Sequence, residues 1–389
     1  MSLVGIIAEF NPLHNGHKYL ISEAKKYGKV AVVISGNFVQ RGDTAVYEKR
    51  VRAKAALMCG ADIAAELPVC YSMSTAQNFA LGGVSMLNAL GCDTIMFGSE
   101  CGDIDTLLKT ADILKSQKFK ELLPQNLQNG VTFAAARQKT AEECGAPKGI
   151  LEGANNNLAI EYIIAAEEIN PHIGFKTVKR QGAEHDSIDF CDEFASAGAL
   201  REEIKNRNFT NIKNYVPGEA YEIFKQADFS DINRLERAII SALRSKQKDD
   251  FKNLPDLSEG VENKIYSAVQ ISKTLDELYG NIKVKRYTLA RVRRLVLYAF
   301  LNIDNSQFLK APPYLRVLGF SKDGEQILRK NTPESPIPIV MRATEIENLG
   351  DNAKRMFATE NRATDIYALS LNTPFDCGLE YTAKLIKIN

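Results

Sequence analysis

The stretch Val4–Leu20, VGIIAEFNPLHNGHKYL, decides the fold because its character changes twice within a few residues. The apolar, β-rich run at its start predicts a buried strand, and the amphipathic residues at its end predict a helix. Between them lies NPLHNGH, which holds two of the four histidines of the chain. In a doubly wound sheet, the turn after the first strand borders the ligand crevice. The stretch therefore predicts an α/β fold and the place of its site.

Four more β-rich runs follow in the first 206 residues and alternate with helical patterns. These runs are KVAVVISG (29–36), ADIAAELP (61–68), CDTIMFG (92–98) and IGFKTVKR (173–180). Two of the helical segments end at Gly28 and Gly60, and glycine readily adopts the left-handed conformation that closes many helices. This alternation predicts a doubly wound parallel sheet, covered by helices on both faces, over residues 1–206.

Beyond residue 206 the pattern becomes mostly helical, so we predict a second, mostly helical region over residues 207–389. Roughly the last 75 residues differ, because they mix turns with short β-like runs such as LRVLGF (315–320) and IPIVM (337–341). The pattern leaves open whether this small mixed part forms a third unit.

The composition is that of an ordinary globular protein, with 45% hydrophobic and 25% charged residues and a net charge of +1. No apolar run approaches the roughly 20 residues of a membrane-spanning helix, and the start of the chain lacks the pattern of an export signal. The seven cysteines form no CxxC pair, which indicates reduced thiols. We expect a cytoplasmic protein that binds no membrane, and no protein partner is evident. Any polyanion must be held by a local basic patch.

The HNGH turn has the features of a phosphate site. A helix that begins near Asn15 offers unpaired backbone N–H groups and a positive dipole end, and Gly16 lets a phosphate approach the backbone closely. His14 and His17 could donate hydrogen bonds to phosphate oxygens and stabilise the charge that develops there. Two other interpretations remain open at this point. The histidines could ligate a metal, although no third ligand follows by spacing, or they could cap the helix.

EFNPLHNGH resembles the HxGH signature of the nucleotidylyltransferase superfamily, whose members bind ATP over that turn and catalyse attack on its α-phosphorus. A second superfamily element resembles ASAGALR (195–201). There Ser196 would supply a hydroxyl and helix-terminal amides, and Arg201 a charge for the outer phosphates. Gly198 stands where threonine is usual in that element. Taken alone, the segment is also typical of a capped helix.

Seven strings in order are similar to the tRNA(Met) cytidine acetate ligases over nearly the whole chain: GIIAEFNPLHNGH, SGNFVQRGD, ADIAAELP, FGSECG, ANNNLAIEY, VKRQGAEHD and YLRVLGF. The resemblance implies activation of acetate with ATP as acetyl-adenylate. The acetyl group would then pass to the exocyclic amine of the wobble cytidine in elongator tRNA(Met), forming N4-acetylcytidine. ATP, with Mg²⁺ screening its phosphates, is the implied cofactor. Ala154 and Ala159 depart from the proline and glycine common in the family.

The same resemblance assigns the site. His14 and His17 would be catalytic, and no metal ligand is assigned. The implied ATP-binding residues are Ile7, Ala8, Glu9, Phe10, Asn11, Pro12, Leu13, His14, Asn15, Gly16, His17, Lys18, Tyr19, Leu20, Gly102, Asn155, Arg180, Ser196 and Arg201. Other polar residues receive no fixed role: His185 could face the site, and Asn37, Gln40, Arg41 and Asp43 could orient acetate or the cytosine edge.

A basic segment, IKVKRYTLARVRRLVLY (282–298), is the predicted RNA contact because clustered cations neutralise phosphates and tyrosine can stack on a base. Its implied tRNA-binding residues are Lys283, Lys285, Arg286, Arg291, Arg293 and Arg294, with Tyr287 among them. KRVRAK (49–54) could extend this track toward the crevice. The segment is equally typical of a helix with a solvated basic face.

Two other functions stay open from the sequence. A nucleotidylyltransferase that adenylylates a small phosphorylated metabolite would share the HxGH chemistry but would not need the basic region. A non-catalytic RNA-binding protein would need the basic region but not the histidines.

Overall fold

The computed structural model describes residues 2–127, 131–180, 190–191, 194–258, 260–285 and 287–388. All five predicted runs form strands: β1 (Leu3–Ala8), β2 (Lys29–Ser35), β5 (Ile63–Leu67), β6 (Thr94–Ser99) and β7 (Gly174–Lys179). They pair in parallel in the order β5-β2-β1-β6-β7. The order reverses beside β1, and in open α/β sheets such a point lies at the ligand crevice. The predicted doubly wound α/β fold is confirmed.

Alternate residues of the strands enter two separate cores, as expected of a sheet covered on both faces. In β1, Val4 and Ile6 pack into one core and Leu3 and Ile7 into the other. The first core is completed by α1 (Asn15–Lys25), α2 (Lys49–Met58), α9 (Ala197–Lys205) and α11 (Gly218–Gln226). The second is completed by helices that include α4 (Ala76–Ala89) and α8 (Ala154–Ile169).

The C-terminal part of the chain joins this same sheet. Strand β10 (Leu315–Ser321) pairs antiparallel with β5, and β11 (Ile339–Val340) and β12 (Ile386–Ile388) both pair parallel with β10. Between these strands lie α16 (Lys322–Asn331), α17 (Ala343–Ile346), α18 (Asp351–Ala368) and α19 (Leu379–Thr382). The mixed C-terminal residues therefore add three strands to the sheet of the N-terminal part, and the preceding helical region stands between two segments that build one sheet.

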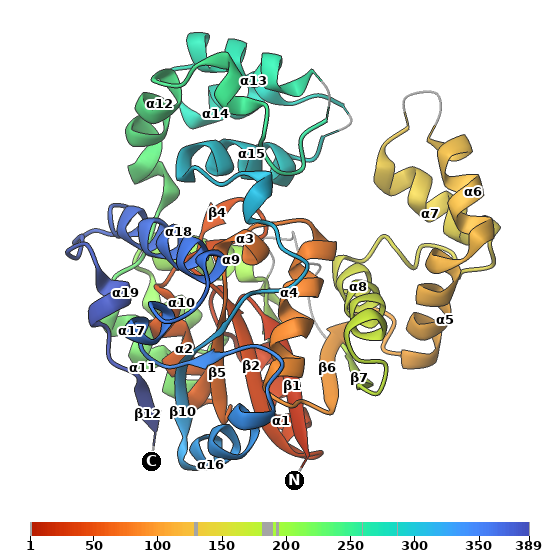
Figure 1. Cartoon of the computed structure of the whole chain (residues 1–389), viewed down its shortest axis with the longest axis vertical. Coiled ribbons are helices and arrows are strands. Elements are labelled where there is room, and N and C mark those ends of the chain that lie inside the picture. Colours follow the sequence, from red (N-terminus) through yellow and green to blue (C-terminus); the bar gives the residue numbers. More distant parts are fainter. Residues whose placement is uncertain are drawn as a thin grey trace.

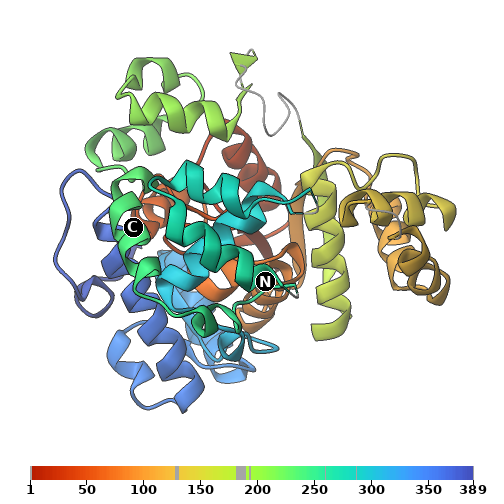
Figure 2. The same cartoon turned by 90° about the horizontal axis from the view of Figure 1, so that it is seen from above.

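Two groups of helices extend beyond the sheet (Figure 1). The side lobe comprises α5 (Ile104–Lys115), α6 (Gln117–Asn126) and α7 (Phe133–Glu143). The helical lobe comprises α12 (Glu236–Arg244), α13 (Val261–Ile271), α14 (Leu275–Ile282) and α15 (Leu289–Leu301). Seen from above, the helical lobe lies over the sheet and the side lobe stands beside α8 (Figure 2). In the described part of the chain, no helix is long and apolar enough to cross a membrane.

Short strands, helices and 3-10 turns lie between these larger elements. They are β3 (Phe38–Val39), β4 (Asp43–Thr44), α3 (Val69–Ser72), β8 (Phe190–Cys191), β9 (Phe194–Ala195), α10 (Phe209–Ile212) and the 3-10 turns Ile232–Leu235, Lys248–Phe251, Asn305–Gln307 and Thr332–Glu334.

KRVRAK does not extend the basic track to the cavity, because Lys49 and Arg52 are buried, Arg50 is held in ion pairs, and the exposed Lys54 does not line the cavity. Lys49 is fully buried at the start of α2, where its ammonium group contacts the carboxyl groups of Glu66, Glu360 and Glu380. Arg52 is also fully buried and donates to backbone carbonyls, among them that of Tyr47 at 2.8 Å. A buried cation needs such partners, since desolvation of an unpaired charge costs several kcal/mol. These residues tie α2 to β5, α18 and α19.

Candidate active site

The histidine turn is built as a reciprocal helix cap. His14 is the N-cap of α1, and its Nδ1 accepts from the backbone N–H of Gly16 at 3.1 Å. The backbone N–H of His14 in turn donates to Nδ1 of His17 at 3.2 Å, and the two rings stack at 3.8 Å. Because each Nδ1 accepts, a neutral ring carries its proton on Nε2. Capping and donation to a phosphate are therefore compatible roles, carried by different nitrogens of the same rings.

A cavity of about 970 Å³ lies against this turn. It reaches the upper end of the range usual for ligand sites, so it has room for a nucleotide and a second substrate. Most of the implied ATP-binding residues line it: Ile7, Ala8, Glu9, Phe10, Asn11, His14, Gly16, His17, Tyr19, Leu20, Asn155, Arg180, Ser196 and Arg201.

Five implied residues do not line the cavity: Pro12, Leu13, Asn15, Lys18 and Gly102. Leu13 is buried in the core, and the Asn15 side chain donates to the carbonyl of Asn214 at 2.8 Å. Lys18 ion-pairs with Glu219 at 2.9 Å on the surface.

Gly102 has a backbone role that explains why glycine stands there. Its φ is +68°, and a Cβ at this position would lie 2.5 Å from Cβ of Lys179 on β7. Any larger residue would be strained and would push the loop after β6 away from β7. Gly102 thus lets the loop after β6 lie close to Lys179, which lines the cavity.

A hydrogen-bonded chain connects the ends of β6 and β7 through the start of α8. The Glu100 carboxylate accepts from the side-chain and backbone nitrogens of Asn155 at 2.7 and 3.0 Å and from the backbone of Asn156 at 2.7 Å. Burial opposes the charge of Glu100, but these hydrogen bonds outweigh it and hold its pKa below the usual value. Oδ1 of Asn155 accepts from Arg180 at 3.2 Å. Asn155 is thereby fixed in orientation beside Arg180.

The remainder of this asparagine run, Asn156 and Asn157, has structural contacts that the sequence did not indicate. Buried Asn156 accepts from the backbone N–H groups of Glu100 and Cys101, which holds the loop after β6. Asn157 accepts from Arg137 of α7 at 3.1 Å, and Arg137 also pairs with Glu161 at 2.6 Å. An asparagine run in the first turn of a helix is the signal that could have pointed to such contacts, since each amide offers both a donor and an acceptor.

The second superfamily element also lines the cavity, at Ser196 and Arg201. Ser196 is the N-cap of α9 and accepts from the backbone of Ala199 at 3.1 Å, as the capped-helix interpretation predicted. Arg201 donates to the carbonyl of Asn11 at 2.9 Å, so it is held next to the histidine turn. Burial lowers the pKa of Arg201, against the nearby charges of Glu9 and Asp43, and its guanidinium remains a cation at neutral pH.

The loop after β2 contains one residue with a structural contact and three that line the cavity. Asn37 is buried and binds the backbone of Lys49 at 2.8 Å, so it does not reach the cavity. Gln40, Arg41 and Asp43 line the cavity. Burial raises the pKa of Asp43, and nearby cations including Arg201 and Arg293 oppose this shift. His185 lies outside the described residues.

The basic segment borders the same cavity, which Lys285, Arg291, Arg293 and Arg294 line. Not all of its charge is available for RNA. Arg294 is buried and ion-pairs with Asp256 at 2.9 Å, and Arg291 donates to the Asp256 carbonyl at 2.6 Å. Lys283 is exposed outside the cavity lining, and Arg286 lies outside the described residues.

Tyr287 is buried, and the guanidinium of Arg291 covers its ring at 4.0 Å. The expectation that this tyrosine stacks on a base is therefore wrong for this conformation.

The described residues bring together no group of three or more His, Cys, Asp or Glu side chains able to hold a metal ion. This chain therefore supplies no cage for Mg²⁺ within its described parts. An expected Mg²⁺ would depend on the triphosphate for its ligands, as is usual for this ion.

Comparison with known proteins gives the family. A family model described as HIGH Nucleotidyl Transferase matches residues 1–377. A protein of Thermoanaerobacter sp. (strain X514), named tRNA(Met) cytidine acetate ligase, is 38% identical over the whole of both chains. A protein of Clostridium tetani with the same name is 36% identical over 93% of this chain and 96% of its own. The chain belongs to the tRNA(Met) cytidine acetate ligase family.

Solved structures agree with this membership. The crystal structure of Thermotoga maritima TmcAL without ligand is 29% identical, with a TM-score of 0.92 over all of both chains. A second crystal structure of that protein, bound with alpha-thio ATP, is 28% identical with a TM-score of 0.89 over the same coverage. As the likeness spans both whole chains, it includes the helical lobe and the C-terminal strands. This member of the tRNA(Met) cytidine acetate ligase family therefore has the same overall architecture as Thermotoga maritima TmcAL.

Proposed function

We propose that this chain activates acetate with ATP as acetyl-adenylate and transfers the acetyl group to the exocyclic amine of the wobble cytidine of elongator tRNA(Met). One observation carries the proposal: a single cavity is lined by the histidine turn on one side and by cations of the basic segment on the other. A small phosphorylated metabolite would not require the second wall. Family membership supports the same activity, and we expect it in the cytoplasm, where tRNA and ATP are found.

In the first step, a carboxylate oxygen of acetate attacks the α-phosphorus of ATP. A new P–O bond forms, the bond to the bridging oxygen breaks, and pyrophosphate leaves with the electron pair. His14 and His17 donate from Nε2 to the phosphate oxygens, and the N-terminal amides of α1 add a positive dipole. Arg201 and Arg180 attract the outer phosphates. Mg²⁺ carried by the triphosphate would further screen its charge.

In the second step, the exocyclic nitrogen of cytidine attacks the acyl carbon of acetyl-adenylate. A C–N bond forms, the C–O bond to AMP breaks, and the nitrogen loses one proton. AMP is a good leaving group, so positioning of the amine is the main task of the protein. The RNA must present this base unpaired, because a stacked base cannot enter a cavity.

The proposed ATP contacts are those implied residues that line the cavity, with His14 and His17 as the catalytic pair. The proposed RNA contacts are Lys285 and Arg293, since the ion pair and hydrogen bonds of Arg294 and Arg291 with Asp256 engage those two side chains.

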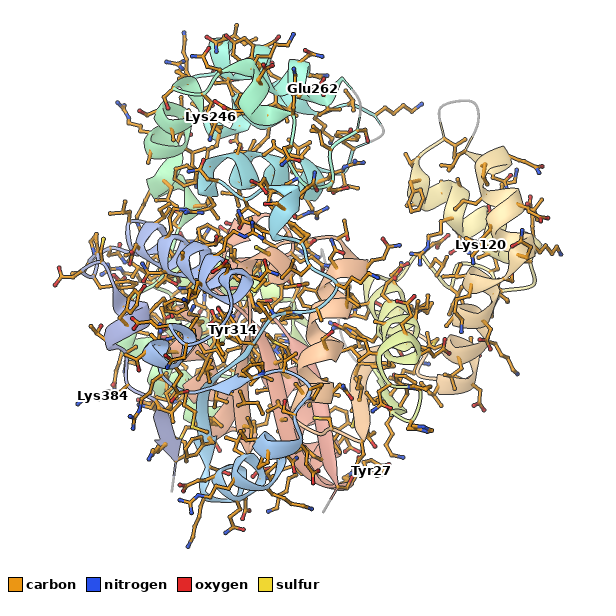
Figure 3. The ribbon with its side chains drawn as sticks, viewed as in Figure 1. Tyr27, Lys120, Lys246, Glu262, Tyr314 and Lys384 are labelled. Carbon is orange, nitrogen blue, oxygen red and sulfur yellow. The ribbon has the colours of Figure 1, made fainter. Side chains whose placement is uncertain are left out.

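The direct test mixes the protein with labelled acetate, ATP and elongator tRNA(Met) and measures acetylcytidine. Lys285→Glu should weaken tRNA binding and reduce the slope of log affinity against log salt by roughly one, because one phosphate contact is lost. Lys384→Glu is the matched control, since this exposed lysine lies on another side of the molecule (Figure 3). Folded wild-type protein that forms no acetylcytidine would refute the proposal. Exchange of pyrophosphate that requires a phosphorylated metabolite, and not acetate, would favour the other enzyme class.

A further inference from the structure

Phe133 is an aromatic side chain that the fold leaves uncovered. It is the first residue of α7 in the side lobe, it is 54% exposed, and it lines the cavity. A single exposed apolar residue is ordinary on a protein surface, but an aromatic ring in the wall of a cavity that takes a nucleic acid can stack on a base. The ring belongs to neither of the two hydrophobic cores.

The helix that carries Phe133 is anchored at its first turn, so the backbone position from which the ring projects is defined. Thr132 caps α7 by accepting from the backbone of Ala135 at 3.3 Å. One turn after Phe133, Arg137 binds Asn157 at 3.1 Å and Glu161 at 2.6 Å, both on α8. The buried carboxylate of Glu161 makes this pair costly to break. Helix α7 is therefore attached to α8 on the side that faces the cavity.

The same helix α8 connects this wall to the proposed ATP site. Asn155 in its first turn holds Arg180, and Asn157 in that turn holds Arg137. Phe133 is thus positioned relative to the nucleotide by two successive contacts of one rigid element. A ligand that reaches from the ATP site to Phe133 would meet a preorganised surface.

Lys285 and Arg293 of the helical lobe line the same cavity. The side lobe and the helical lobe both stand beyond the sheet, where Lys120 marks the former and Lys246 and Glu262 mark the latter (Figure 3). A cavity with cations on one wall and an exposed aromatic ring on another suits a chain of phosphates that carries unpaired bases. Tyr287 does not provide the stacking surface on the basic side, because Arg291 covers it.

We propose that Phe133 stacks on an unpaired base of the tRNA anticodon loop, so that the RNA is gripped between the side lobe and the helical lobe. This inference rests on the proposed function and adds a base-stacking residue to it. Stacking on phenylalanine tolerates any base, so Phe133 would contribute affinity and placement rather than sequence selection.

The test compares Phe133→Ala and Phe133→Trp with Tyr27→Ala. Tyr27 is a matched control, because it is 48% exposed and lies near the N-terminus, away from both lobes (Figure 3). Each variant is assayed for acetate-dependent ATP–pyrophosphate exchange without RNA, for tRNA binding, and for acetylation at varied tRNA concentration. A thermal melt verifies that each variant is folded.

We expect Phe133→Ala to weaken tRNA binding and to lower kcat/KM for tRNA by roughly 5- to 150-fold, the range for loss of one stacked base. Exchange should stay within about twofold of wild type, and Phe133→Trp should retain tRNA binding. A matching loss of exchange would overturn the inference, because the ring would then serve the adenine of ATP. Binding equal to that of Tyr27→Ala would overturn it too. Wild-type protein that binds tRNA through Phe133 without acetylating it would defeat only the proposed function.

Discussion

The imidazole of His14 caps α1 through Nδ1 and is proposed to donate to a phosphate through Nε2. A pair of substitutions should separate these two roles. His14→Asn keeps an oxygen that can accept from the backbone of Gly16, because asparagine is among the best N-cap residues. His14→Ala loses that acceptor. Both variants lose the Nε2 donor and the stacking on His17, and both keep the backbone hydrogen bond from residue 14 to His17. Their difference therefore reports the cap alone, and what they share reports the donor and the stacked ring.

The expected magnitudes follow from these contacts. Loss of a donor to developing charge costs roughly 100- to 1,000-fold in rate, so both variants should lose acetate-dependent exchange to that extent. Loss of the cap should destabilise only His14→Ala, by about 1 kcal/mol. In a chain of this length such a change moves Tm by only about 1 °C, whereas the urea midpoint shifts by about 0.3 M for a slope near 3 kcal/mol per M.

Stability is measured as the urea midpoint and activity as the rate of acetate-dependent exchange, on the same preparation of each variant. Wild-type protein is the reference in both measurements. If His14→Asn exchanged at the wild-type rate, the imidazole would have no part in the chemistry, and His14 would be a cap alone. If both variants were equally destabilised, the hydrogen bond from Gly16 would not account for the stability of the turn.

Three further predictions concern the surroundings of the site. Gly42→Ala should loosen the helical lobe and raise the KM for tRNA, because φ is +72° and the new Cβ would lie 2.6 Å from Cβ of Arg293; limited proteolysis of the lobe checks this. Burial, with Glu66 nearby, raises the pKa of Glu360 to about 8, so the native state keeps a proton that the unfolded chain releases as pH rises from about 5. The free energy of unfolding of the wild type should therefore fall by up to about 1.4 kcal/mol per pH unit between pH 5 and 8. Glu360→Gln should abolish this contribution, and urea midpoints measured at pH 5 and at pH 8 check it. Glu100→Gln should raise the KM for ATP several-fold in the exchange assay, as one helix-capping acceptor is lost, and an unchanged KM would contradict the proposed role of this chain of hydrogen bonds.

The parallel strands are predictable because each is a local apolar run bounded by helical patterns, and the parallel α/β rules then dictate their arrangement. The position of β10 is not predictable in this way. LRVLGF has the pattern of a strand, but periodicity does not state which edge it joins or in which direction. Its antiparallel pairing with β5 depends on contacts between segments far apart in the chain. Strand identity is local information, whereas strand partnership is not.

The site shows the same division. The HNGH turn could be placed from sequence because strand, turn and helix are contiguous there. The inward orientation of Lys49 could not, because two of its partners, Glu360 and Glu380, lie in the C-terminal part of the chain. Arg291 and Arg294 looked like free cations for the corresponding reason: Asp256, which binds both, belongs to another segment. A count of basic residues therefore overestimates the charge that a surface offers.

The pairing of β10 with β5 also constrains how the protein matures in the cell. A ribosome releases β5 long before the strand that covers its edge, and it releases Lys49 long before Glu360 and Glu380. Until then the nascent chain carries an open strand edge, which invites aggregation, and a lysine that lacks two of its buried partners. The edge of the sheet beside β5 is thus covered only after the residues of β10 have been made.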